Sequence, residues 1–186
     1  MNEQIGQHYL ADIVRQLEKL RRLAEDAVRQ VKDDQFFLAL DPDSNSIALI
    51  VKHVAGNMRS RWRDFLTTDG EKPDRHRDRE FELEATDTRA ALMQRWEEGW
   101  GYALGTIRAL RPDDLQKTVT VRGEPHVVLE AINRQVAHYA YHVGQVVYVA
   151  KHLAGPSWKT LSIPRGRSRD YDVTKTGEVY RPKEKR

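Results

Sequence analysis

The sequence contains no cysteine. Disulfide bonds, thiolate metal ligands and a cysteine nucleophile are therefore excluded from any account of its stability or its chemistry. If the protein uses a thiol in a reaction, that thiol has to come from another molecule.

Long hydrophobic runs are missing as well. No apolar stretch reaches the roughly 20 residues that a helix needs to cross a bilayer, so we expect no membrane partner. The N-terminal segment from Met1 to Gln4 is polar and is not followed by the apolar core of a signal peptide, which predicts a cytoplasmic protein. A chain of 186 residues, of which 39% are hydrophobic, is long enough for one domain with a core and too short for two.

An excess of one charge is confined to the end of the chain. The net charge is +3, and residues 164–186 alone carry eight Lys or Arg against four Asp or Glu, so residues 1–163 are nearly neutral. DNA-binding folds gather positive charge on a folded face, so we expect no specific nucleic-acid partner. We predict one domain over residues 1–163 and a basic, extended tail over residues 164–186.

Apolar residues recur at helical spacing in four segments. We predict helices over residues 3–31, 47–66 and 129–153, and a further helix that begins after a cap within residues 86–88 and ends before Pro112. The alternation in residues 117–128, with Gly123-Glu124-Pro125 at its centre, predicts a short hairpin before the last helix. Residues 67–85 are densely charged and predict a solvated surface loop. The pattern as a whole predicts an all-α protein, a four-helix bundle with one long crossing connection.

Three histidines lie in these helices at positions that suit a metal site. His138 and His142 are four residues apart, so they share one face of the last helix, and His53 lies in the middle of the second. Spacing alone is a weak signal, and a hydrogen-bonded core histidine is the simpler interpretation of His53. The polar residues Arg134, Gln135 and Gln145 lie on the same side of the last helix as the pair. Buried polar groups need partners, and a metal with the groups around it would supply them.

Several short segments resemble an uncharacterised bacterial branch of the DinB-like, YfiT-like superfamily of metal-dependent proteins. They are Ser44-Asn45-Ser46-Ile47, Lys52-His53, Gly56-Asn57, Ser60-Arg61-Trp62, Asp64-Phe65-Leu66, Asp69-Gly70-Glu71-Lys72, Tyr141-His142-Val143-Gly144-Gln145, Trp158-Lys159 and Leu161-Ser162-Ile163-Pro164. The resemblance implies a four-helix bundle, often dimeric, with a divalent metal on one histidine of the second helix and an H-x-x-x-H pair of the fourth. Those positions here are His53, His138 and His142. It also implies kinship with transferases and isomerases that use low-molecular-weight thiols.

Three histidine ligands leave at least one coordination position open, as catalytic sites do. Imidazole suits zinc, nickel, iron or manganese, and the sequence does not distinguish among them. We therefore expect a metal-dependent enzyme that activates water or a low-molecular-weight thiol for transfer to, or hydrolysis of, a small electrophile. The candidates for contacting a small-molecule substrate or supporting the ligands are Asn57, Arg134, Tyr141 and Gln145.

The alternative is a non-catalytic metal-binding or dimerisation module. The last helix is more apolar than one buried face requires, which predicts a homodimer in either case. An open cavity at the metal would favour catalysis, and a sealed site would favour a structural role.

Overall fold

The computed structural model describes residues 2–170, and the remaining residues, 1 and 171–186, lie outside the described part. The predicted tail over residues 164–186 therefore falls mostly outside it. Its described start includes a short 3-10 helix, η4 (Ser168–Asp170).

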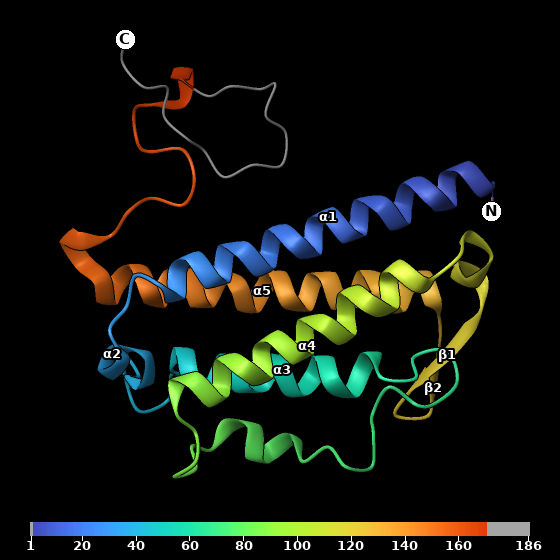
Figure 1. Ribbon diagram of the computed structural model, residues 1–186, viewed down its shortest axis with the longest axis horizontal. Coiled ribbons are helices and arrows are strands. Elements are labelled where there is room, and N and C mark those ends of the chain that lie inside the picture. The colour runs from blue at the N-terminus through green and yellow to red at the C-terminus, as the bar shows by residue number, and fades with distance from the viewer. Residues whose placement is uncertain (1, 171–186) are drawn as a thin grey trace.

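The described chain is predominantly helical with one small sheet, in agreement with the all-α expectation (Figure 1). The long helices are α1 (Glu3–Val28), α3 (Ile47–Trp62), α4 (Arg89–Ala109) and α5 (Val128–Ala154). Helix α1 lies along α5, and α4 crosses α3 (Figure 1).

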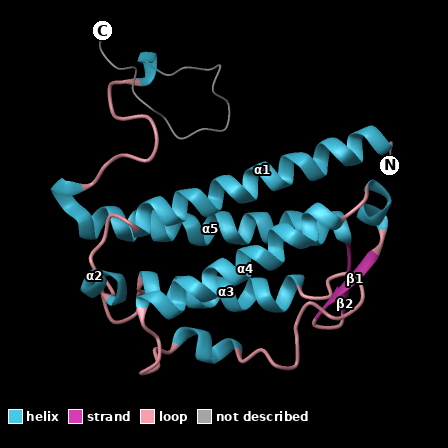
Figure 2. Cartoon of the chain, in the orientation of Figure 1, coloured by secondary structure: helices cyan, strands magenta, loops and turns pink. Residues whose placement is uncertain are grey.

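Short elements connect the long helices (Figure 2). They are α2 (Asp33–Phe37), the 3-10 helices η1 (Arg77–Phe81), η2 (Pro112–Gln116) and η3 (Gly155–Ser157), and the strands β1 (Thr118–Val121) and β2 (Glu124–Val127). The strands pair antiparallel, with Val121 opposite Glu124, and confirm the predicted hairpin before the last helix.

Local sequence sets most helix boundaries. The hydroxyl of Ser46 accepts a hydrogen bond from the Leu49 N–H, and Thr88 caps α4 in the same way through the Ala91 N–H. The predicted helix over residues 47–66 is four residues too long, because α3 ends at Trp62. Helix α2 was not predicted, since five residues hold too little periodicity to be recognised.

The core is built from large aromatic side chains between the long helices. Trp62, Trp96, Trp100 and Tyr139 are all at most 2% exposed. The indole N–H of Trp62 donates to the Tyr139 hydroxyl over 2.9 Å, and that hydroxyl donates to the Asn57 side-chain oxygen over 3.0 Å. This buried chain of hydrogen bonds fixes α3 against α5 at Tyr139, the residue that follows His138.

The charged stretch between α3 and α4 is not a solvated loop in its central part, contrary to the prediction from its composition. It returns along α3, with η1 against that helix (Figure 1). Lys72 and Glu80 are buried, at 6% and 7% exposure. Burial is tolerated because each charge has a partner: the Lys72 ammonium donates to the Asp69 carbonyl, and Glu80 pairs with Arg75.

The same stretch holds the hairpin in place. The Asp69 carboxylate accepts hydrogen bonds from the backbone N–H groups of Arg122 and Gly123, at 2.9 and 2.8 Å. Both residues have positive φ angles, 57° and 77°. Asp69 therefore stabilises a tight turn in which Arg122 adopts a left-handed conformation that is unfavourable for a side chain of its type.

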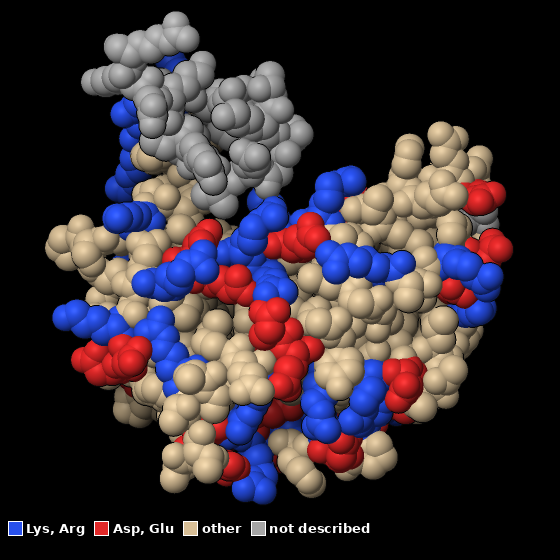
Figure 3. Space-filling view, in the orientation of Figure 1, with Lys and Arg blue, Asp and Glu red and all other residues tan. Residues whose placement is uncertain are grey.

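Two surface properties bear on partners. None of the helices in residues 2–170 combines the length and apolar character needed to cross a membrane. On the face shown in Figure 3, basic and acidic side chains are interspersed rather than segregated.

Candidate metal centre

Three histidines from two helices converge at one point. His53 comes from α3, and His138 and His142 come from successive turns of α5. The Nε2 atom of His138 lies 3.4 Å from Nε2 of His53 and 3.1 Å from Nε2 of His142. Each histidine offers a ring nitrogen within 4.8 Å of the other two, so together they can hold a metal ion.

Hydrogen bonds at the opposite ring nitrogens decide which nitrogens carry protons. Nδ1 of His53 lies 2.8 Å from the Glu80 carboxylate, and Nδ1 of His142 lies 2.8 Å from the Gln145 side-chain oxygen. Both acceptors require an N–H at Nδ1, so in the neutral rings the facing Nε2 atoms carry lone pairs. At least two of the three converging nitrogens are therefore electron-pair donors.

This arrangement fits a divalent cation. A tetrahedral ion with metal–nitrogen bonds of about 2.1 Å places its ligand nitrogens about 3.4 Å apart, which agrees with the observed spacings. Burial, followed by the neighbouring His142 and His53, lowers the pKa of His138 from 6.5 to about 3. Burial also lowers the pKa of His142. Both rings are thus held in the neutral form that a metal requires.

A buried carboxylate positions His53. Glu80 binds the His53 ring and also receives two hydrogen bonds from the Arg75 guanidinium, at 2.8 and 2.9 Å. Burial raises the pKa of Glu80, but the hydrogen bonds from Arg75 and His53 outweigh it and leave that pKa below its usual value. Glu80 is therefore an anion beside the ligand, an arrangement typical of histidines that bind zinc.

Gly56 and Phe81 also shape the surroundings of His53. A Cβ atom at Gly56 would collide with the Glu80 carboxylate, so the absence of a side chain on α3 makes room for it. The Phe81 ring stacks on the His53 ring with centroids 4.7 Å apart. Neighbouring residues of η1 thus fix both the edge and the face of His53.

A cavity of about 160 Å³ adjoins the ligands. His53 and His138 form part of its wall, together with Asn57, Gln135, Val121 and five arginines: Arg61, Arg75, Arg77, Arg122 and Arg134. We call this space the arginine cavity. The three-histidine site is therefore open on one side rather than sealed.

The structure brings all four predicted supporting residues close to the histidines, in different roles. Asn57 and Arg134 line the arginine cavity. Gln145 holds His142 through its side-chain oxygen. The Tyr141 ring lies beside His142 with centroids 5.2 Å apart, and its side chain is 65% exposed.

Sequence reasoning missed the residues contributed by the charged stretch. Glu80, Arg75 and Glu71 form a chain of ion pairs leading away from His53, with Glu71 3.1 Å from Arg75. A run of alternating charges gives no periodic signal that separates buried from solvated members. A local hint near Glu80 was Phe81, an aromatic residue in a densely charged segment.

Fold and site together define a helical protein with an open three-histidine site. The chain belongs to the family described as a protein of unknown function, DUF1572, whose model matches residues 4–167. Searches of curated proteins and of solved structures found no match.

Proposed function

We propose that the protein is a metal-dependent enzyme that uses water or a low-molecular-weight thiol to attack a small electrophile. The observation that carries this proposal is the open cavity beside the candidate ligands. His53 and His138 line a cavity with room for a substrate, whereas closed structural sites surround the ion with protein ligands.

The fold supports kinship with the DinB-like, YfiT-like superfamily. We propose that α1, α3, α4 and α5 form its four-helix bundle, with His53 from the second long helix and the His138–His142 pair from the last. Those are the positions that the resemblance assigns to the metal ligands. The kinship makes a thiol the preferred nucleophile, and water the other.

A bound divalent cation would supply a Lewis acid that lowers the pKa of water or a thiol and polarises an electrophile. The protein's own groups prepare the site for it. Glu80 and Gln145 hold His53 and His142 with Nε2 directed at the ligand point. Asn57 is held in the cavity wall by the Tyr139 hydroxyl, where its side chain can orient a substrate. Because the chain has no cysteine, the thiol must enter as a second substrate.

The alternative function is a non-catalytic metal-binding or dimerisation module. One surface favours dimerisation whichever function holds. Ala137, Tyr141, Gly144 and Tyr148 follow one another at helical spacing on α5, and all four are exposed. Tyr148 is 71% exposed. We propose that this stripe is the interface of a homodimer, because small and aromatic side chains allow close contact between two helices.

The decisive experiment compares the wild type with His142→Ala. Each protein is loaded with zinc, nickel, iron or manganese and assayed for thiol conjugation and for ester and amide hydrolysis. We expect activity with at least one metal in the wild type and its loss in His142→Ala. Activity that survives the substitution would place the chemistry elsewhere and favour the module.

A further inference from the structure

The arginine cavity has properties that a metal site alone does not require. Five arginines surround it, and the carboxylates that pair with them within residues 2–170 are Glu71, Glu80 and Asp78. Asp78 is almost fully exposed and lies 3.9 Å from Arg77, so that pair is weak. The cavity therefore carries an excess of positive charge directly beside a site that is itself expected to hold a cation.

Arg61 is the clearest sign that a partner is missing. Its side chain is only 5% exposed, and its Nε and Nη1 atoms are buried without a hydrogen-bond partner. The nearest carboxylate oxygen, on Glu71, is 3.7 Å from Nη2, which is too long for a hydrogen bond. A buried guanidinium without hydrogen bonds is costly, and an anion in the cavity would compensate that cost.

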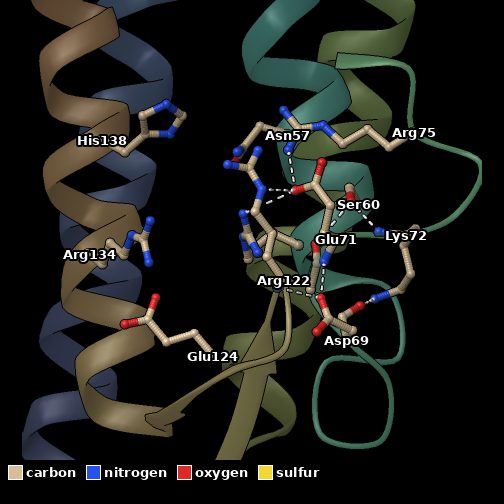
Figure 4. A network of polar contacts seen from close by, with 12 residues as sticks. Asn57, Ser60, Asp69, Glu71, Lys72, Arg75, Arg122, Glu124, Arg134 and His138 are labelled. Atoms are coloured by element: carbon tan, nitrogen blue, oxygen red, sulfur yellow. Dashed lines mark hydrogen bonds and ion pairs between the residues drawn. The ribbon is translucent and has the colours of Figure 1, made fainter.

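Arg134 contributes to the α5 side of the arginine cavity. It projects from α5 toward the α3 side, across from Arg122 and Arg75 (Figure 4). No carboxylate in the described residues lies within ion-pair distance of it, and its hydrogen-bonding neighbour is the His126 ring at 3.4 Å. Its donors thus remain available to a ligand.

Arg122 occupies its place at a conformational cost. Its φ angle of 57° is in the left-handed region, where asparagine or glycine would be more favourable. The turn places its guanidinium in the cavity wall, 3.4 Å from Glu71. Strained residues of this kind concentrate at ligand sites, where the surrounding contacts enforce the geometry.

We infer that the arginine cavity binds an oxyanion group, a carboxylate or a phosphate, of the substrate and so holds the reacting part against the three histidines. Guanidinium groups recognise both anions through paired N–H donors. At about 160 Å³ the cavity is smaller than the roughly 300–1,000 Å³ of sites that enclose drug-sized ligands, so it takes the anionic end of a small molecule. As a statement about substrate, this inference rests on the proposed function.

The test measures anion binding without using enzyme activity. The full chain is stripped of metal, dialysed into a buffer of low ionic strength and titrated calorimetrically with inorganic phosphate and, separately, with malonate. Removing the metal separates binding by the arginines from coordination by the ion. We expect saturable binding by at least one anion, and the stronger of the two identifies the oxyanion preferred.

Three variants locate the binding. Arg134→Gln removes a charge at an exposed position of α5, and Arg122→Asn removes one while suiting the left-handed turn, so both should fold. Loss of one charged hydrogen-bonding partner should weaken binding about tenfold or more in each variant. Arg22→Gln, at an exposed position of α1 outside the cavity, should bind as the wild type does.

The outcomes separate this inference from the proposed function. Binding that is weakened in both cavity variants and unchanged in the control supports the oxyanion site, even if His142→Ala were to leave activity intact. Absence of binding by both anions, or equal binding by the wild type and all three variants, overturns it, even if the metal is bound and active.

Discussion

At the scale of single residues, the site depends on the second nitrogen of each imidazole. The acceptors at Nδ1 of His53 and His142 turn Nε2 of both rings toward His138. His138 differs, because its Nδ1 is buried without a partner in the described residues. Two of the three candidate ligands are therefore oriented by hydrogen bonds at Nδ1, and the third is oriented by packing.

The ligand assignment predicts the metal content of a double variant. His138→Ala combined with His142→Ala removes two of three nitrogen donors and should abolish retention of about one divalent ion per chain. Elemental analysis of protein purified without an affinity tag measures this. His152→Ala, an exposed histidine of the same helix, should retain the wild-type metal content. Undiminished metal in the double variant would show that the site lies elsewhere.

The role of Glu80 predicts a weaker but specific effect. Glu80→Gln keeps the shape of the side chain and removes the charge that holds the His53 ring, so metal affinity should fall about 10- to 100-fold. A competition titration with a chromogenic chelator measures this. Glu82→Gln, a nearby exposed position, is the matched control. Equal affinities in the two variants would mean that Glu80 serves the fold and not the ligand.

At the scale of elements, the segment between α3 and α4 connects the site to the hairpin. Its η1 helix supplies Glu80 and Phe81 to His53, and its earlier part supplies Asp69 to the turn that carries Arg122. One irregular segment therefore positions a candidate metal ligand and a wall of the arginine cavity. This explains why so polar a stretch is partly buried.

The Asp69 contact predicts how stability responds to acid. Burial raises the pKa of Asp69, but hydrogen bonds from the N–H groups of Glu71, Gly123 and Arg122 outweigh it and hold the pKa far below the unfolded value of 3.8. The stabilisation is therefore complete above about pH 4 and is lost as the pH falls further, because the unfolded chain then binds the proton first.

Asp69→Asn makes this measurable. Its stability deficit relative to the wild type, from urea denaturation, should be largest near neutral pH and shrink below pH 4. Asp113→Asn, with its side chain at the surface, should show no such trend. A deficit for Asp69→Asn that did not vary with pH would contradict a role for the carboxylate charge at the turn.

At the scale of the whole molecule, α5 serves two surfaces. One face contributes two candidate ligands, wall residues of the cavity (Arg134, Gln135 and His138) and core contacts, and an adjacent face presents the exposed stripe with Tyr141 and Tyr148. A partner on the stripe would cover Tyr141 next to His142, and Ala137 of the stripe lies about one helical turn from Arg134 of the cavity wall.

The dimer prediction follows from this surface. The wild type should be a dimer at micromolar concentration by light scattering, and Tyr148→Arg should be a monomer, because a bulky charge replaces an aromatic contact on both copies at once. Tyr102→Arg, on α4, should stay dimeric. A monomeric wild type would refute the proposed interface.

The sequence by itself determined the long helices and pointed to three histidines as candidate metal ligands. Helical periodicity is a local property, so the long helices, the hairpin and the start of α4 after residues 86–88 could be predicted to within a few residues. The spacing of His138 and His142 placed them on one face for the same reason. The pairing with His53 required the resemblance, because spacing within one helix does not say which other helix lies opposite.

Only the tertiary structure decided which charges are buried. Glu80 lies 27 residues from His53 along the chain, and Arg134 and Arg61 reach one cavity from two different helices. Residues 67–85 look uniformly solvated in sequence, yet packing against α3 selects some of their charges for the interior and leaves others in water. Burial of a charge depends on whether a partner of opposite charge is close in space, and that distance is set by the packing of helices and not by local sequence.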